Sequence, residues 1–237
     1  MQLTIAEIAP HFPDFRVAAV VATGFAVPPE RPAELDRLIA AREAACRARY
    51  AGMELSAIPG VAAWRRAYRA FGIKRTSYRP SVERLVKNAL AGRGLPRING
   101  FVDAYNAVSL AHVLPLGADD LDKVAGGLAF RYAREHDDFV DMGAEAGEDA
   151  KDPPKPGEVV YADGEKVLCR RWNWRQDARS AISAGSRRAV VTVQWNGVGD
   201  FDAAVADLLD LLGRFCGART GVAVADAGRP TVILPEP

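Results

Sequence analysis

The 237-residue sequence has only three cysteines and three histidines. Cys46, Cys169 and Cys216 lie far apart and are odd in number, so they fit neither a disulfide framework nor a zinc site. Such cysteines suit a reducing compartment, and we therefore expect a cytoplasmic protein. The histidines have no metal-ligand spacing, and we predict that the protein uses no metal ion and no other cofactor.

The sequence also has no long apolar run and no excess of one charge. Without about 18 uninterrupted apolar residues, it predicts no membrane-spanning helix. The N-terminus lacks a basic region and is interrupted by Pro10 and Pro13, which argues against a signal peptide. Lys and Arg total 31 and Asp and Glu total 30, for a formal net charge of +1. Any contact with RNA must therefore come from a local patch.

Several common catalytic motifs are missing. There is no Walker loop, no G-x-G-x-x-G motif after a strand and no G-x-S-x-G elbow, so neither a nucleotide cradle nor a serine hydrolase of that type is expected. Cys169 has Arg170 and Arg171 beside it, but neighbours on a strand face opposite sides. We interpret Cys169 as a small buried hydrophobic residue.

Hydrophobic periodicity predicts an α+β fold, with helices in the first half of the chain and antiparallel strands in the second. The length allows one large domain or two small ones. Helices are expected over 34–50, 61–72, 81–90, 101–112 and 200–217. Strands are expected over 15–27, 128–134, 138–143, 188–195 and 229–235, with a hairpin over 158–172. Turn residues predict loops over 114–127 and 143–158.

The predicted helix 101–112 is apolar, yet it carries Asp103, Asn106 and Ser109 at every third position. On a helix these side chains share one face with Asn99. A polar face in so apolar a segment is either solvated or lines a pocket. The residues alone leave both interpretations open.

Two segments combine basic and aromatic residues. Residues 168–179 contain four arginines and two tryptophans, and residues 64–79 interleave Arg and Lys with four aromatic residues. This composition suits a surface that stacks bases and contacts phosphates, with Trp172 or Trp174 stacking a terminal base. The alternatives are a solvated face held by ion pairs and, for one of the tryptophans, a position in the core.

Four blocks of the sequence resemble one family in their residues and in their order along the chain. They are GIKRTSYRPSVERLVKNAL, LPRINGFVDAYNAVSLAHVLPLGADDLDKVAGGLAFRYA, GEVVYADGEKVLCRRWNWRQD and VVTVQWNGVGDFDAAVADLLDLL, within about residues 65–215. They resemble the tRNA-editing module of the phenylalanyl-tRNA synthetase beta subunit, the B-three/B-four domain, in its free-standing form. The resemblance implies a single domain over residues 1–237, with helices packed on an antiparallel or mixed sheet, in which residues 1–64 add an N-terminal strand and helices.

The resemblance implies an editing-domain fold and a hydrolase that removes a noncognate amino acid from the end of a tRNA. Its partner would be the aminoacylated acceptor end, and a homodimer is left open. The site residues fall into three groups. Water and carbonyl positioning is expected from Asn106, Ser109 and Gly117. Substrate binding is expected from Asp103, Tyr105, Pro115, Gly126, Asn173 and Gln194. Contacts with tRNA are expected from Arg75, Arg171 and Arg175.

The chain departs from the synthetase pattern inside the implied pocket. Tyr105 stands where bacterial synthetases have Thr, and Gly117 stands where they have His two residues after the proline. The Glu that reads a tyrosine hydroxyl there has Thr192 or Gln194 as its nearest equivalent. These departures bear on tyrosine specificity rather than on hydrolysis, because such sites position water. Two hypotheses follow: a trans-editing deacylase, and a module that binds tRNA or an amino acid without catalysis.

Overall fold

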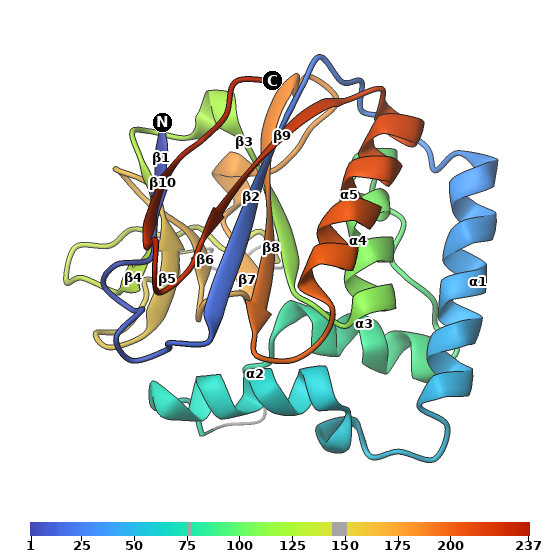
Figure 1. Cartoon of the computed structure of the whole chain (residues 1–237), viewed down its shortest axis with the longest axis horizontal. Helices are drawn as coiled ribbons and strands as arrows, with labels where there is room; N and C mark the ends of the chain where they lie inside the picture. The colour runs from blue at the N-terminus through green and yellow to red at the C-terminus, as the bar shows by residue number, and fades with distance from the viewer. Residues whose placement is uncertain (75–76, 144–150) are drawn as a thin grey trace.

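The computed structural model describes residues 1–74, 77–143 and 151–237. The helices in these residues are α1 (Ala33–Arg49), α2 (Pro59–Ala70), α3 (Ser81–Leu90), α4 (Gly100–His112) and α5 (Phe201–Cys216). They pack against two sheets (Figure 1). The predicted α+β class is therefore confirmed. None of the helices in the described part of the chain is both long and apolar enough to span a membrane.

The first sheet has four antiparallel strands in the order β3-β8-β2-β9. Its members are β3 (Leu116–Asp120), β8 (Arg188–Asn196), β2 (Phe15–Thr23) and β9 (Arg219–Ala225). Strand β2 is buried on both faces: Ala18 and Val20 face the helices, whereas Val17 and Ala19 face the second sheet. Burial on both faces explains why β2 reads as an almost continuous apolar run.

The second sheet has six strands in the order β10-β1-β4-β5-β6-β7. Its members are β10 (Thr231–Ile233), β1 (Gln2–Thr4), β4 (Leu128–Tyr132), β5 (Val159–Ala162), β6 (Val167–Arg170) and β7 (Arg175–Gln176). The pair β1–β4 is parallel and the other pairs are antiparallel, so the sheet is mixed. Because β1 pairs with β10, the first and last strands of the chain lie side by side (Figure 1).

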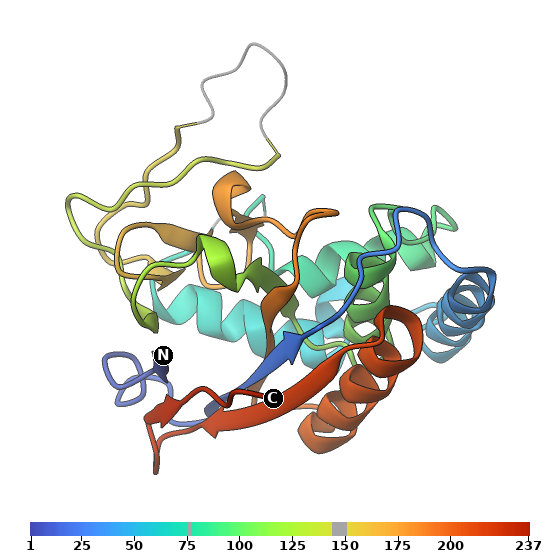
Figure 2. The same ribbon diagram turned by 90° about the horizontal axis from the view of Figure 1, so that it is seen from above.

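The helices and the two sheets form successive layers (Figure 2). Helices α1, α4 and α5 lie on one side of the four-stranded sheet, and the six-stranded sheet lies on the other. Helix α4 packs between α1 and α5, which makes it apolar on nearly every side. Helices α2 and α3 run across one end of the layers and close the space between them.

An aromatic cluster fills the core between the sheets. Trp172 is fully buried and lies at its centre. Its ring centroid is 4.7 Å from Phe12, 4.8 Å from Phe15 and 5.3 Å from Trp64 in edge-on contacts. Aromatic contacts of this kind add to the stabilisation from burial alone. Trp172 therefore occupies the core position that was the alternative to base stacking.

The structure differs from the predicted elements in five places. The segment 114–127, predicted to be a loop, contains β3 and a 3-10 helix, Leu121–Lys123. The predicted strand 138–143 is reduced to isolated bridges at Val140 and Asp141, because each bridges a different segment. Strands β1, β7 and β9 were not predicted. Of the predicted loop 143–158, residues 144–150 lie outside the described residues.

Candidate functional site

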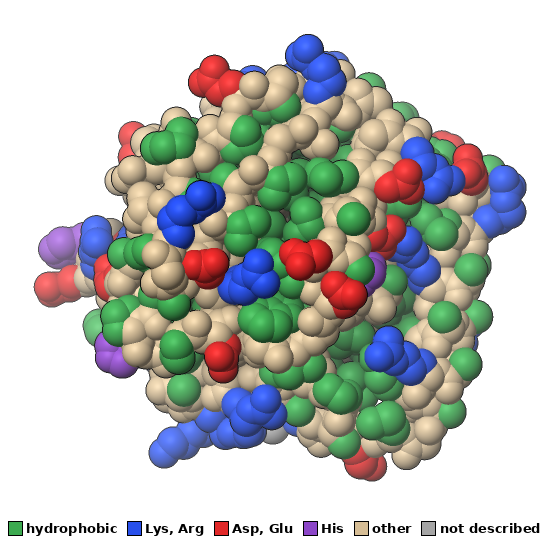
Figure 3. Space-filling model, viewed as in Figure 1, with side chains coloured by type: hydrophobic (Ala, Val, Ile, Leu, Met, Phe, Trp, Pro, Cys, Tyr) green, Lys and Arg blue, Asp and Glu red, His purple; other side chains and the backbone are tan. Residues whose placement is uncertain are grey.

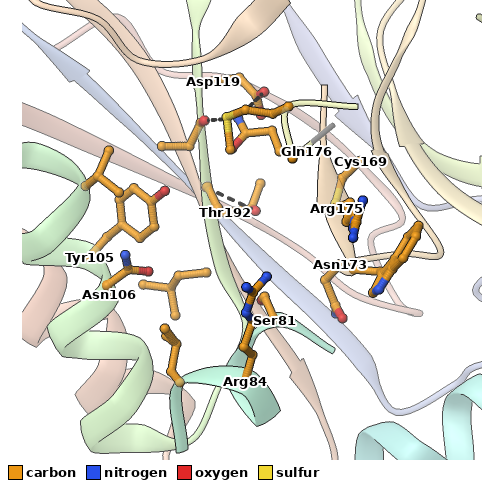
Figure 4. Close-up of a pocket in the computed structure, with 18 of the residues that line it drawn as sticks. Ser81, Arg84, Tyr105, Asn106, Asp119, Cys169, Asn173, Arg175, Gln176 and Thr192 are labelled. Carbon is orange, nitrogen blue, oxygen red and sulfur yellow. Dashed lines mark hydrogen bonds between the residues drawn. The ribbon is translucent and has the colours of Figure 1, made fainter. Parts of the chain in front are cut away.

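A cavity of about 580 Å³ lies between the two sheets, with α3 and α4 forming part of its wall (Figure 4). Strands β3 and β8 of the four-stranded sheet and β5, β6 and β7 of the six-stranded sheet contribute side chains to its wall. Ile98 and Met142, which are 54% and 52% exposed, lie at its rim. Its size and mixed lining are typical of a small-molecule site.

Helix α4 presents Val102, Tyr105 and Asn106 to the cavity. These positions are three and four residues apart and so share one face. The helix begins at Asn99, whose side chain accepts a hydrogen bond from the Val102 amide at 2.9 Å. Asn106 and Tyr105 both point into the cavity in Figure 4. Within the described residues, no hydrogen bond joins either polar group to another side chain, which leaves both available to a ligand.

The other polar residues of α4 lie away from the cavity. Asp103 is 1% exposed, and it accepts hydrogen bonds from Arg31 Nε at 2.9 Å and from the Ile98 amide at 3.1 Å. Ser109 donates its hydroxyl proton to the Leu114 carbonyl at 2.6 Å, which closes the end of the helix. The polar face predicted from spacing therefore divides between a structural ion pair, a helix closure and one group, Asn106, that lines the cavity.

One wall carries a chain of hydrogen-bonded side chains. Tyr68 donates to Asn173 Oδ1 at 2.9 Å, and Asn173 Nδ2 donates to Gln194 Oε1 at 3.0 Å. Gln194 Nε2 then donates to Thr192 Oγ1 at 3.2 Å, and Thr192 contacts the Gly117 carbonyl at 3.5 Å. Because each member fixes the next, these dipoles are held in place before any ligand arrives.

Asp119 on β3 is a cavity residue that the sequence analysis missed. It is 3% exposed, and its Oδ1 accepts hydrogen bonds from Ser180 Oγ at 2.7 Å and Gln176 Nε2 at 3.0 Å. Gln176 Nε2 also donates to the Ala118 carbonyl. Burial raises the pKa of Asp119 to about 7, against the effect of the two donors, and the negative charge of Asp163 adds to the increase.

Residues 63–198 match the sequence model of the B3/4 domain family. The chain belongs to the B3/4 domain family. The resemblance predicted from the sequence is thereby confirmed, and every residue that lines the cavity lies within the matched segment.

The chain is also similar to two phenylalanyl-tRNA synthetase beta-subunit sequences, one of them a fragment. The chain is 33% identical over 84 residues to the phenylalanine–tRNA ligase beta subunit of Fusobacterium nucleatum subsp. nucleatum, a match that covers 35% of this chain and 10% of that protein. It is 10% identical, with a TM-score of 0.46, to the crystal structure of an N-terminal fragment of the phenylalanyl-tRNA synthetase beta subunit from Pyrococcus horikoshii. That comparison covers 92% of this chain and 49% of the other.

Three further predicted residues of this B3/4 domain lie at or near β3. Gly117 lines the cavity, and a Cβ atom there would meet nothing within 4 Å, so the missing side chain enlarges the space. Pro115 is buried and does not line the cavity; its carbonyl accepts a hydrogen bond from the Gln194 amide at 3.0 Å. Gly126 lies at a turn with φ of 66°, next to Gly164 and away from the cavity.

The arginines predicted to contact tRNA have different surroundings. Arg171 is 3% exposed, forms an ion pair with Glu158 at 3.2 Å and stacks on Tyr78 at 3.7 Å. Burial lowers the pKa of Arg171. Arg175 lines the cavity but is paired with Asp141. Arg75 lies outside the described residues. Arg171 is therefore not on the surface, and Arg175 is already partly neutralised.

A different arginine lies at the entrance of the B3/4 cavity. Arg84 on α3 is exposed, lines the cavity and forms no ion pair within the described ranges. Trp174 also lines the cavity and is half-buried, with the Arg175 guanidinium 4.7 Å from its ring centre. The spacing of apolar residues predicted a helix that includes Arg84, but only the tertiary structure brings this residue to the rim of the cavity.

The lining offers groups that orient a ligand rather than a strong nucleophile. Cys169 lines the cavity, but burial, followed by the charge of Asp119, raises its pKa far above the usual range, and the thiol stays protonated. Within residues 1–74, 77–143 and 151–237, no three His, Cys, Asp or Glu residues are grouped as metal ligands. The amides, hydroxyls and Asp119 can instead hold a polar molecule and a water in fixed positions.

Proposed function

We propose that this chain is a cytoplasmic aminoacyl-tRNA deacylase that acts in trans on misacylated tRNA. The observation that carries the proposal is the cavity inside the segment that matches the B3/4 family, lined by pre-oriented amide and hydroxyl groups. An aminoacyl ester is already activated. Placing a water beside its carbonyl and stabilising the developing negative charge is therefore sufficient for hydrolysis.

Asn106 has the role of orienting water or the amino acid. Its amide faces the cavity and has no hydrogen-bond partner within the described residues. An amide can donate and accept at once, so it can hold a water between itself and the substrate carbonyl. Ser109 has no place in this scheme, because its hydroxyl is committed to the Leu114 carbonyl.

Carbonyl binding is assigned to the free edge of β3. In an antiparallel ladder, every second residue of a strand forms backbone hydrogen bonds with the partner strand. The Gln194 amide bonds to the Pro115 carbonyl, so Gly117, two residues further along and opposite Thr192, is also a hydrogen-bonded position. The backbone groups of Ala118 consequently point away from β8, on the outer edge of the sheet. The Ala118 amide, rather than that of Gly117, is the donor that we assign to the developing oxyanion.

The entrance would receive the tRNA acceptor end. Arg84 supplies a cation without an ion pair among the described residues, and Trp174 supplies a face for a terminal base. On the face of the molecule in Figure 3, Lys and Arg side chains are interspersed with Asp and Glu, so this face has no broad basic surface. We expect modest affinity and a log–log salt slope of roughly −2 to −4, as for few neutralised phosphates.

The test is a panel of tRNAs, each charged with one amino acid. Purified protein is incubated with each, and loss of the acyl group is compared with spontaneous hydrolysis under the same conditions. We expect accelerated loss for one or a few aminoacyl groups. If the folded protein leaves every member of the panel intact, the deacylase proposal is wrong.

A second candidate is a module that binds tRNA or an amino acid without hydrolysis. It is favoured by the chain from Asn173 through Gln194 to Thr192, in which the polar groups already satisfy one another. This candidate predicts binding to a member of the same panel with the ester left intact. Filter binding alongside the deacylation assay separates the two functions.

A further inference from the structure

Asp119 uses only one of its two oxygens within the described chain. Both hydrogen bonds, from Ser180 and Gln176, go to Oδ1. Oδ2 accepts none there, although Asp119 lines the cavity and is only 3% exposed. A buried carboxylate oxygen normally has a donor, because its desolvation is otherwise uncompensated. Oδ2 is therefore an open acceptor inside the cavity.

Two phenols line the same cavity as this carboxylate. Tyr161 lines the cavity and is 2% exposed, and its hydroxyl has no hydrogen-bond partner in the described structure. Burial, and next the negative charge of Asp119, raises the pKa of both Tyr161 and Tyr105 well above the usual range. Both phenols therefore stay protonated and lie within the field of Asp119, each with an oxygen that can accept a hydrogen bond.

The charge of Asp119 has no resident counterion. No ion pair joins it to a Lys or Arg in the part of the chain that the structure describes. Arg175, the lining cation of the adjoining wall, is paired with Asp141, and Arg84 is exposed on α3. Figure 4 places Arg84 and Asp119 at opposite ends of the cavity. A cation supplied by the ligand would relieve the cost of burying this carboxylate.

We propose that Asp119 determines specificity by binding a protonated amine, the α-ammonium group of the aminoacyl ester. This inference rests on the proposed function. An ammonium group has three donors, which Asp119 Oδ2 and the oxygens of Tyr161 and Tyr105 can accept. A neutral hydroxyl would supply one donor and leave the buried charge uncompensated.

The position of the carbonyl site selects the α-amine rather than a side-chain amine. The Ala118 edge and the Asp119 carboxylate belong to consecutive residues, and a single nitrogen, Gln176 Nε2, contacts both the Ala118 carbonyl and Asp119 Oδ1. The two binding groups are therefore neighbours. In an aminoacyl ester, the carbonyl and the α-ammonium are likewise attached to adjacent carbons.

A chemical consequence follows for the range of substrates. An ester whose α-amine is acylated has lost its charge and cannot bind Asp119 as an ammonium. We therefore expect the protein to act on free aminoacyl esters and to reject N-acylated ones, which include peptidyl esters. The amino acid side chain does not enter this discrimination.

The experiment compares each charged tRNA that the parent deacylates with the same tRNA after N-acetylation. We expect acetylation to lower kcat/KM by roughly 10- to 100-fold, the range for losing a hydrogen bond to a charged group. In Asp119→Asn, kcat/KM for the free-amine substrate should fall by a similar factor, whereas kcat/KM for the acetylated substrate should not change. The ratio of the two kcat/KM values should therefore approach one. Asp122→Asn, at an exposed carboxylate nearby in sequence, is the matched control and should keep the parent ratio.

A calorimetric titration separates failure of this inference from failure of the proposed function. Methyl esters of the amino acids and their N-acetyl forms are titrated into the parent, Asp119→Asn and Tyr161→Phe. If no charged tRNA is deacylated but free-amine esters bind the parent in preference to acetylated ones, the deacylase proposal falls and the amine site stands. Equal treatment of free and acetylated compounds by the parent, a preference that survives in Asp119→Asn, or no binding by any amine, would overturn the amine site.

Discussion

Replacing Asp119 with Asn should make the protein more stable, by an amount that grows with pH. The Asn Oδ1 can keep the hydrogen bonds that Ser180 and Gln176 donate, while Nδ2 takes the place of the open Oδ2. The substitution therefore removes the buried charge and little else. The opposite result, a loss of stability, is the common outcome of a core substitution, so the prediction is a demanding one.

The magnitude follows from the pKa of the carboxyl in the two states. Folding raises it from 3.8 to about 7, chiefly through burial. The folded parent thus retains a proton that the unfolded chain releases, and its stability falls as pH rises between these values. At about 1.4 kcal/mol per pKa unit, the raised pKa of Asp119 lowers the unfolding free energy of the parent by roughly 2 kcal/mol at pH 5 and by about 4 kcal/mol at pH 8. The Asn variant does not titrate there, so its advantage should grow by about 2–3 kcal/mol over this range.

Urea unfolding of both proteins at pH 5, 6.5 and 8 measures this difference. Other ionisable groups near the carboxylate, among them Asp163, Tyr105 and Tyr161, are present in both proteins, so their own titrations largely cancel. A difference in unfolding free energy that stays constant from pH 5 to 8 would refute the reasoning. Such a constant difference is the result expected if the folded carboxyl is already ionised at pH 5.

Four further predictions concern the site and its surroundings. Asn106→Ala should lower deacylation by about ten- to a thousandfold while changing the unfolding free energy little, because it removes a positioning group; parallel kinetics and denaturation show whether the two effects separate. Trp172→Ala should lose about 3–5 kcal/mol of stability, whereas Trp174→Ala should mainly weaken tRNA binding, by about 1–3 kcal/mol; the reverse pattern would exchange their roles. Arg84→Ala should reduce the log–log salt slope of tRNA binding by about one, measured by titration at several salt concentrations. Arg171→Ala should instead lower the melting temperature, and an unchanged melting temperature would contradict its burial.

The helices and long strands were predictable because their periodicity reflects burial. Helix α5 has a clear helical periodicity, and strands β2 and β8 are rich in β-branched residues and are followed by glycine, Gly24 and Gly197. Strand β3 was not predictable, since Gly117 and the pair Asp119–Asp120 have the composition of a turn. The strand forms because β8 supplies a ladder partner and because Ser180 and Gln176, distant in sequence, donate to its buried carboxylate.

Composition also misled the interpretation of the arginines. Arg171 and Trp172 both have positive φ values, 45° and 67°, a conformation that a sequence rarely announces for residues of this size. The resulting turn carries the tryptophan into the core and the guanidinium under Tyr78. In α4, spacing correctly grouped the polar residues on one face. It could not show which of them faces a cavity, because neighbouring elements bury the helix on nearly every side.

The cavity lies between two sheets that share no strand pair in the described residues and are joined by apolar side chains and by the Asn173–Gln194 and Gln176–Asp119 hydrogen bonds. The two sheets can therefore shift slightly relative to each other while each keeps its own backbone hydrogen bonds. A ligand that contacts β3 in one sheet and β5 or β7 in the other would link the two sheets and restrict this motion. Amide hydrogen exchange should then slow together in strands of both sheets, including strands that the ligand never touches.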